Sequence, residues 1–307
     1  MNNIFLKRYD EFFGLKSSQK LIEIQKSHMN DKYIRINFSK TSKEKIETFF
    51  KKNRVKFSNT FLPNCLKIEK SFFNLVSSLP ALTGQIYFQD IASQIPANLI
   101  EFSKFKSKKI SVLDMAASPG SKTTQIADKL REKKLDFEIF ALEPEVKRLQ
   151  KLINNIQKQS FENIKIFNTT GQEFKTKKKF DLIILDAPCS GNLITDRNWL
   201  SKRNLMGVEQ KSKLQRELLK KASSLLCENG ILIYSTCSQE PEENEFNVNW
   251  ALSKLPLVKG KTNFVLPFEN PLIKSFKGQN FELGTSFRIC PIYSKTQGFF
   301  VSIFEKK

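Results

Sequence analysis

Histidine is almost absent from this chain. The 307 residues contain one histidine, His28, in a polar N-terminal stretch. A Ser-His-Asp triad, a Cys-His dyad or a histidine-rich metal site would have to be built on that single residue. We therefore expect His28 to be a solvated surface residue, and any cysteine chemistry to be activated by other means.

Cysteine is also scarce, and its spacing argues against two kinds of site. The five cysteines form no Cys-x-x-Cys pair, which argues against zinc, and their odd number argues against a disulfide framework. No apolar run approaches the roughly 20 residues of a membrane span, and residues 1–14 lack a signal-peptide core. We expect a cytoplasmic protein without metal or membrane. The cysteines are Cys65, Cys189, Cys227, Cys237 and Cys290.

Acidic residues are too few to balance the basic ones. The chain has 51 Lys and Arg against 31 Asp and Glu, a net charge of +20 and a pI of about 9.7. This balance favours a polyanionic partner, most simply nucleic acid, although a merely solvated, lysine-rich surface is the alternative. The length predicts two domains, or one large domain with an extension, and the 40% hydrophobic fraction is enough for a substantial core.

The first 80 residues predict a small basic α/β unit. Its positive charges either contact the phosphates of a partner or form a solvated helix face. We place a domain boundary near residue 80, with a basic N-terminal module over 1–80 and a second domain over 81–307. The predicted elements are a helical stretch at 1–27, strands at 33–37 and 54–57, a helix that follows the capping box TSKE at 41–44, and an irregular segment at 63–80.

Strands and helices alternate through the remainder of the chain. Repeated strand–helix units predict a doubly wound α/β sheet of the Rossmann-like kind, with the N-terminal α/β unit as an extension. The predicted strands are 84–90, 110–114, 137–142, 164–167, 180–185, 231–235 and 298–304. The predicted helices are 91–103, one from about 123, 145–159, 211–226 and one that starts at 241–245.

Two of the predicted strands end in cysteine motifs, DLIILDAPCSG at 181–191 and GILIYSTCS at 230–238. Each opens with an Ile- and Leu-rich run typical of a strand buried on both faces of a parallel sheet. The intervening helix predicts parallel, neighbouring strands, which lie about 4.8 Å apart. Ligands bind at the carboxyl ends of such strands, so we expect Cys189 and Cys237 to face one small volume.

The loop at 115–122, MAASPGSK, follows the strand where this fold holds a nucleotide-like ligand. It is not a G-x-G-x-x-G loop, and a Walker A loop would need glycine in place of Ala116 and Ser121. Its small residues still let the backbone approach a ligand. Glu143 ends the next strand, where an acid commonly accepts hydrogen bonds from ribose hydroxyls; a surface acid at a strand end is the alternative.

Taken together, these motifs resemble the Sun family of RNA cytosine-5 methyltransferases, which use S-adenosylmethionine. The resemblance covers about residues 30–307 and implies that 81–307 is a Rossmann-like methyltransferase domain. The matching stretches are DMAASPGSKT at 114–123, DAPCSG at 186–191, YSTCS at 234–238, PEENE at 241–245, GQIYFQD at 84–90 and GFF at 298–300.

The resemblance also implies site residues. Cys237 would be the nucleophile that attacks carbon 6 of cytosine, Cys189 would assist release, and Asp186 would touch cofactor and base. Lys122 adds positive charge that would lower the pKa of a neighbouring cysteine. The S-adenosylmethionine site would consist of Ala116, Ala117, Ser118, Pro119, Gly120, Ser121, Lys122, Glu143, Arg148, Thr170 and Asp186. Ala116 replaces a cysteine of the family, and Thr170 replaces an acid that contacts adenine.

The expected partner is RNA, and a monomer is expected. Transfer RNA is favoured over ribosomal RNA because the N-terminal module is compact. The target base would have to leave its stack, so folded RNA with single-stranded positions is the natural substrate. Two other functions stay open. One is a non-catalytic RNA-binding or ribosome-assembly factor on the same fold; the other is a nucleotide triphosphatase, suggested by the strand that ends at Asp186 and by GSKT at 120–123.

Overall fold

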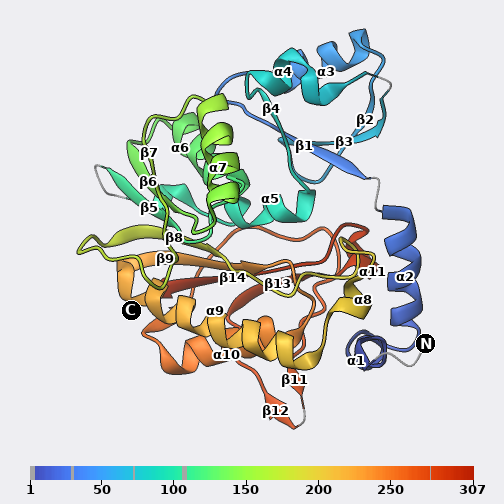
Figure 1. The fold of residues 1–307 in the computed structure, drawn as a ribbon, viewed down its shortest axis with the longest axis vertical. Coiled ribbons are helices and arrows are strands. Elements are labelled where there is room, and N and C mark those ends of the chain that lie inside the picture. Colours follow the sequence, from blue (N-terminus) through green and yellow to red (C-terminus); the bar gives the residue numbers. More distant parts are fainter. Residues whose placement is uncertain (1–3, 29–30, 72, 106–108, 277) are drawn as a thin grey trace. The chain divides into compact units, whose positions relative to one another are not determined.

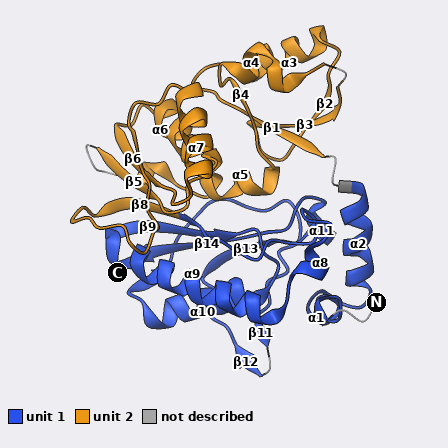
Figure 2. Ribbon diagram, viewed as in Figure 1, with its two compact units in different colours: residues 1–30, 185–307 blue, residues 31–184 orange. Residues whose placement is uncertain are grey.

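The protein forms two compact units in the computed structural model, which describes residues 4–28, 31–71, 73–105, 109–276 and 278–307 (Figure 1). Residues 1–30 and 185–307 make up the first unit, and residues 31–184 the second (Figure 2). The side chain of His28 lies outside the described part of the chain, so its predicted exposure stays a prediction. Among the described residues, no helix has the length and apolar character that a membrane crossing requires.

The second unit begins with a four-stranded antiparallel sheet in the order β2-β3-β1-β4. A cluster that includes Ile34, Ile46, Phe50 and Leu66 forms its core. The elements are β1 (Lys32–Ile36), α3 (Lys43–Lys52), β2 (Lys56–Asn59), β3 (Cys65–Lys70), α4 (Leu79–Leu82) and β4 (Ile86–Phe88).

Two local predictions for this sheet were wrong. The segment predicted as irregular contains β3, because Leu66 and Ile68 alternate with more exposed residues and are buried against α3. The second strand starts at Lys56 rather than Arg54, because Arg54 has a φ of 56° in the turn that ends α3. The cap of α3 is Ser42, whose side chain accepts a hydrogen bond from the Lys45 backbone.

Parallel strands complete the second unit, as predicted. β5 pairs in parallel with β6 and with β8, and β6 pairs in parallel with β7. All five residues of β5 are buried, including the polar Ser111 and Asp114. The elements are α5 (Ile91–Asn98), β5 (Ile110–Asp114), α6 (Ser121–Glu132), β6 (Phe137–Leu142), α7 (Val146–Lys158), β7 (Ile164–Phe167) and β8 (Phe180–Asp186), whose last two residues belong to the first unit.

The first unit is built around β9 and β14, which pair antiparallel over residues 231–236 and 300–305. β10 and β13 both pair antiparallel with β14. The strands are β9 (Leu226–Thr236), β10 (Leu257–Lys259), β11 (Ser275–Phe276), β12 (Gln279–Asn280), β13 (Thr285–Ile289) and β14 (Phe299–Lys306). The helices are α1 (Ile4–Phe13), α2 (Ser17–His28), α8 (Trp199–Lys202), α9 (Leu205–Leu225), α10 (Glu245–Lys254) and α11 (Pro291–Ser294), and Pro241–Glu243 form the 3-10 turn η3.

The N-terminal helical stretch is two helices rather than one. They separate at Gly14, whose φ of +92° is incompatible with a continuous right-handed helix. Phe5 and Tyr9 of α1 pack against Trp199, with ring centroids 4.7 and 6.4 Å apart. These three aromatic side chains belong to the hydrophobic core of the first unit.

Candidate functional site

Cys189 and Cys237 come together in the first unit. Cys189 lies three residues beyond the end of β8, and Cys237 directly follows β9. Their Sγ atoms are 2.9 Å apart, and the Ala187 amide donates a 2.8 Å hydrogen bond to the Ser235 carbonyl. The two cysteine segments therefore lie side by side, as the sequence predicted; the catalytic roles of the thiols stay predictions.

A buried carboxylate joins the two cysteine segments. Glu243 in η3 accepts hydrogen bonds from the backbone amide of Ser190, at 3.0 Å, and from its hydroxyl. It also accepts from the hydroxyl of Ser238 at 2.7 Å and from Nε2 of Gln215 on α9 at 2.7 Å. Ser190 and Ser238 are the residues that follow the two cysteines, so this carboxylate fixes both segments in one arrangement. Burial raises the pKa of Glu243, and these donors oppose that increase.

The surroundings of Cys189 favour its neutral thiol form. Its hydrogen bond with Cys237 and then its burial raise the pKa of Cys189 well above the ordinary range of a thiol. Either sulfur can be the donor in the contact between the two thiols. On the strand before Cys189, Asp186 accepts a 2.8 Å hydrogen bond from the Ser235 hydroxyl, which orients its carboxylate.

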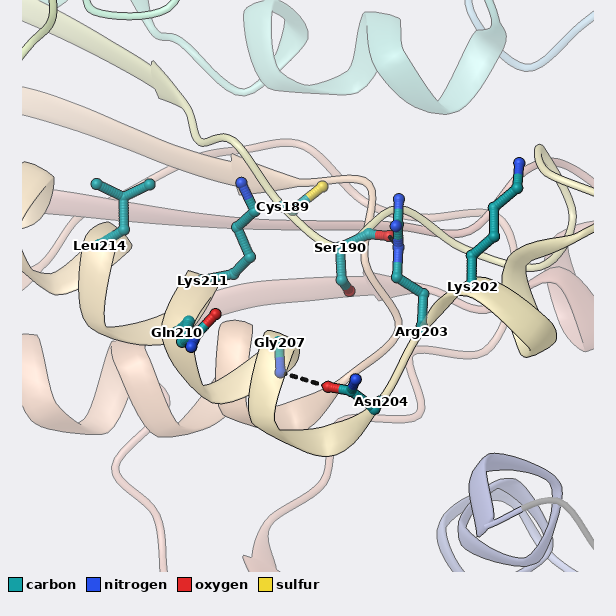
Figure 3. A pocket seen from close by; sticks show the side chains of 9 residues that line it. All are labelled: Cys189, Ser190, Lys202, Arg203, Asn204, Gly207, Gln210, Lys211 and Leu214. Carbon is teal, nitrogen blue, oxygen red and sulfur yellow. Dashed lines mark hydrogen bonds between the residues drawn. The ribbon is translucent and has the colours of Figure 1, made fainter.

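A basic pocket of about 480 Å³ opens beside Cys189 (Figure 3). Figure 3 shows Lys202, Arg203 and Lys211 extending to the same side of the pocket as the Cys189 sulfur. No acidic residue is among its lining, so the pocket suits an anion such as an RNA phosphate. The lining residues are Cys189, Ser190, Lys202, Arg203, Asn204, Gly207, Gln210, Lys211 and Leu214.

The predicted cofactor loop lies in the second unit, between β5 and α6. Ser118 and Arg148 hold it against the start of α7: the Ser118 hydroxyl donates to the Arg148 carbonyl at 2.8 Å, and the Arg148 guanidinium donates to the Ser118 carbonyl at 3.1 Å. Gly120 caps α6 with a φ of +101°, and a Cβ there would lie 3.0 Å from a methyl of Leu152. Glycine is therefore needed for both the backbone conformation and the packing.

Glu143 is not a surface acid. It directly follows β6 and has an exposed fraction of 1%, and one of its carboxylate oxygens accepts a 2.9 Å hydrogen bond from the Glu145 amide. The other lies 3.5 Å from the guanidinium of Arg148. Two of the predicted cofactor residues therefore meet beside the loop. The buried carboxylate and the adjacent loop of small residues fit an adenosyl ligand.

The other predicted residues have local partners. Lys122, in the first turn of α6, is buried and lies 3.4 Å from the Ser93 hydroxyl. The Thr170 hydroxyl donates to the Glu173 carboxylate at 2.8 Å and accepts from its amide at 3.2 Å. Their roles toward cysteine and adenine stay predictions. Within the described ranges, no group of three or more His, Cys, Asp or Glu side chains is placed to hold a metal.

Sequence reasoning missed Asp114, Glu243 and the basic pocket. Asp114, at the end of β5, accepts a 2.6 Å hydrogen bond from the Thr123 hydroxyl and so fixes the loop at both ends. Glu243 lies in the PEENE motif, from which the sequence indicated a helix start and a family match but no role for this carboxylate. The pocket had a sequence signal, because Gly207, Gln210, Lys211 and Leu214 share one face of a helix.

The chain is similar in sequence to known RNA methyltransferases. The family model described as 16S rRNA methyltransferase RsmB/F matches residues 104–305. A tRNA (cytosine(72)-C(5))-methyltransferase from Pyrococcus horikoshii is 32% identical over 224 residues, which are 73% of this chain and 53% of the relative. A ribosomal RNA small subunit methyltransferase F from Cronobacter sakazakii is 35% identical over 191 residues, 59% of this chain and 38% of the relative.

The chain spans about half or less of the length of these curated relatives. Among solved structures, a methyltransferase homologue protein from Pyrococcus horikoshii aligns with a TM-score of 0.84 and 27% identity, and the match covers 99% of this chain and 95% of that one. The structure of NSun6 from Pyrococcus horikoshii with SFG aligns with a TM-score of 0.80 over 98% of this chain and 97% of that one, at 23% identity, and shares the fold.

Proposed function

Because the chain belongs to the family described as 16S rRNA methyltransferase RsmB/F, we propose that it methylates carbon 5 of cytosine in RNA, with S-adenosylmethionine as the methyl donor. The observation that carries this proposal is the contact between the thiols of Cys189 and Cys237, beside a basic pocket. Carbon 5 of cytosine is a poor nucleophile, and addition of a thiolate to the neighbouring carbon 6 provides a way to activate it.

In the proposed reaction, Cys237 adds as a thiolate to carbon 6 of the base and converts the ring to an enamine. Carbon 5 then gains the methyl group, and a base removes the proton from carbon 5 so that Cys237 can leave. Cys189, or a water that it positions, is the proposed base. Asp186, which Ser235 orients, contacts the N3 edge of the cytosine ring and so makes its carbon 6 more electrophilic.

The residues proposed to hold S-adenosylmethionine are the loop from Ala116 to Lys122 together with Glu143, Arg148, Thr170 and Asp186. When bound, this cofactor supplies an electrophilic methyl group. Glu143 is proposed to accept hydrogen bonds from the ribose hydroxyls, and the loop backbone to approach the ligand closely. The buried carboxylate beside the loop, together with its Arg148 partner, supports this assignment.

We propose transfer RNA in preference to ribosomal RNA as the substrate; relatives of both kinds match the chain. Residues 1–80 are proposed to position the RNA through its phosphates, which carry no sequence information by themselves. The cations of the pocket beside Cys189 would hold the backbone next to the flipped cytosine. The net charge of +20 supports a polyanionic substrate.

Bisulfite sequencing of total RNA from cells with and without the gene tests this function. One or more cytosines should lose methylation without the gene and regain it with the wild-type gene. The gene carrying Cys237→Ala should not restore it, whereas Cys227→Ala, which changes a cysteine outside the site, should. If no cytosine changes, the non-catalytic RNA-binding alternative is favoured. Calorimetry with S-adenosylmethionine and with ATP separates a methyltransferase from a nucleotide triphosphatase.

A further inference from the structure

The thiols of Cys189 and Cys237 are close enough to react with one another. Their sulfur atoms are 2.9 Å apart, and a disulfide bond is about 2.05 Å long, so they need to approach by only about 0.9 Å. All five cysteines of the chain are thiols in this structure. The two sulfur atoms are therefore unbonded and lie in a geometry near that of a disulfide.

The surrounding hydrogen bonds keep the two thiols together. Glu243 accepts from the residue that follows each cysteine, and the Asn192 side chain donates a 2.6 Å hydrogen bond to the Cys237 carbonyl. These bonds join the two segments on the carboxyl side of both cysteines. The Ala187 amide joins them on the other side through Ser235. Separating the thiols would break several buried hydrogen bonds.

This pair is also more accessible than two of the other cysteines. Cys189 and Cys237 are both half-buried, and Cys189 lines the basic pocket of about 480 Å³ (Figure 3). A small oxidant can therefore reach the pair through this pocket. Cys65 and Cys290 are fully buried, and burial raises the pKa of each to about 11. Cys227 is half-buried too and serves as an internal control.

We propose that peroxide converts Cys189 and Cys237 to a reversible disulfide that switches the protein off. One thiolate attacks a peroxide oxygen, which gives a sulfenic acid and hydroxide. The second sulfur then attacks the sulfenic sulfur, and the S–S bond forms as water leaves. Together, two thiols and one hydrogen peroxide yield one disulfide and two waters, and a dithiol reductant reverses the change. The loss of activity rests on the proposed function, whereas the disulfide itself rests on the sulfur contact.

The test is to treat the full chain with hydrogen peroxide, alkylate the remaining thiols under denaturing conditions, and analyse the peptides by mass spectrometry. We expect a linked peptide pair that contains Cys189 and Cys237, with the mass of one disulfide. We also expect at least a tenfold loss of methyl transfer to total RNA, restored by dithiothreitol. The matched control Cys227→Ser should give the same linked pair and the same loss.

Two results would overturn the proposal. One is oxidation of Cys189 and Cys237 to sulfinic acids without a linked peptide; the other is a linkage that involves Cys227 instead. Failure of the disulfide switch can be distinguished from failure of the proposed methyltransferase function. A linked pair in a protein that methylates no RNA supports the disulfide and contradicts the function. Methylation that persists in the fully linked protein supports the function and contradicts the switch.

Discussion

Cys189 and Cys237 differ in their surroundings although their sulfur atoms are in contact. Cys189 borders the basic pocket and has a raised pKa, whereas Cys237 directly follows β9 and its carbonyl accepts from Asn192. The sequence alone predicted two cysteines at one sheet edge. Their distinct surroundings depend on side chains from other segments, because Asn192 and the pocket lining lie far from Cys237 in the chain.

Replacing each cysteine with alanine should give opposite results. Cys237→Ala removes the nucleophile, so methylation should cease and no protein–RNA adduct should form. Cys189→Ala leaves attack possible but slows release, so a covalent complex should accumulate when RNA and S-adenosylmethionine are supplied. The measurement is a denaturing gel, with the double variant as the control that should show no shifted band. A band with Cys237→Ala and none with Cys189→Ala would reverse the assigned roles.

Glu143→Ala should weaken S-adenosylmethionine binding by about 1–3 kcal/mol, because charge-assisted hydrogen bonds to the ribose are lost. Isothermal titration calorimetry measures the dissociation constant directly. Thermal unfolding of the same variant is the control, since Glu143 is buried and also accepts from the Glu145 amide. An unchanged dissociation constant in a folded variant would remove Glu143 from the cofactor site.

Among the elements, α9 connects the pocket to the cysteine segments. One face of this helix supplies Gln210 and Lys211 to the basic pocket, and Gln215 donates to Glu243. Lys213, on another face, lines a different pocket together with Glu209 and Glu242. The helix was predicted from its apolar spacing, but it begins six residues earlier than predicted, at Leu205, where the Asn204 side chain accepts from the Gly207 amide at 2.8 Å (Figure 3).

The contact of α1 with the segment after β9 should make stability depend on pH. Burial raises the pKa of Glu240 to about 7, although Arg8 and the Tyr9 hydroxyl oppose the shift. The folded state therefore binds a proton that the unfolded state releases near pH 4.5, so this contribution to stability is lost as the pH rises from about 4.5 through 7.

Glu240→Gln removes this titration and retains an acceptor for Tyr9. The melting temperature of the variant should exceed that of the wild type by a few degrees at pH 8, with a much smaller difference at pH 5. Differential scanning calorimetry at the two pH values measures both differences. An equal difference at pH 5 and pH 8 would show that the carboxyl of Glu240 is not protonated in the folded protein near neutral pH.

For the whole molecule, the net charge of +20 should make RNA binding strongly dependent on salt. If Lys211 contacts a phosphate, Lys211→Gln should reduce the slope of log affinity against log salt by about 0.7 for single-stranded RNA. Lys213→Gln, on the same helix but beside two acids, is the matched control and should change the slope less. Fluorescence anisotropy with a labelled single-stranded RNA measures both slopes. Affinity that does not change with salt would contradict the electrostatic part of the proposed function.

The sequence by itself determined the order of the parallel strands and helices, the small-residue loop after β5 and the two strand ends that carry cysteine. These are local properties, because buried parallel strands are continuous apolar runs and ligand loops follow their carboxyl ends. Only the tertiary structure decided that β14 runs antiparallel to β9, that Arg35 is buried and donates to the Ser121 carbonyl and Asp128, and that Glu243 joins the two cysteine segments. Each of these three features depends on residues that are distant in the chain. The buried side chains of Arg35 and Glu243 are stable only because such residues form hydrogen bonds with them.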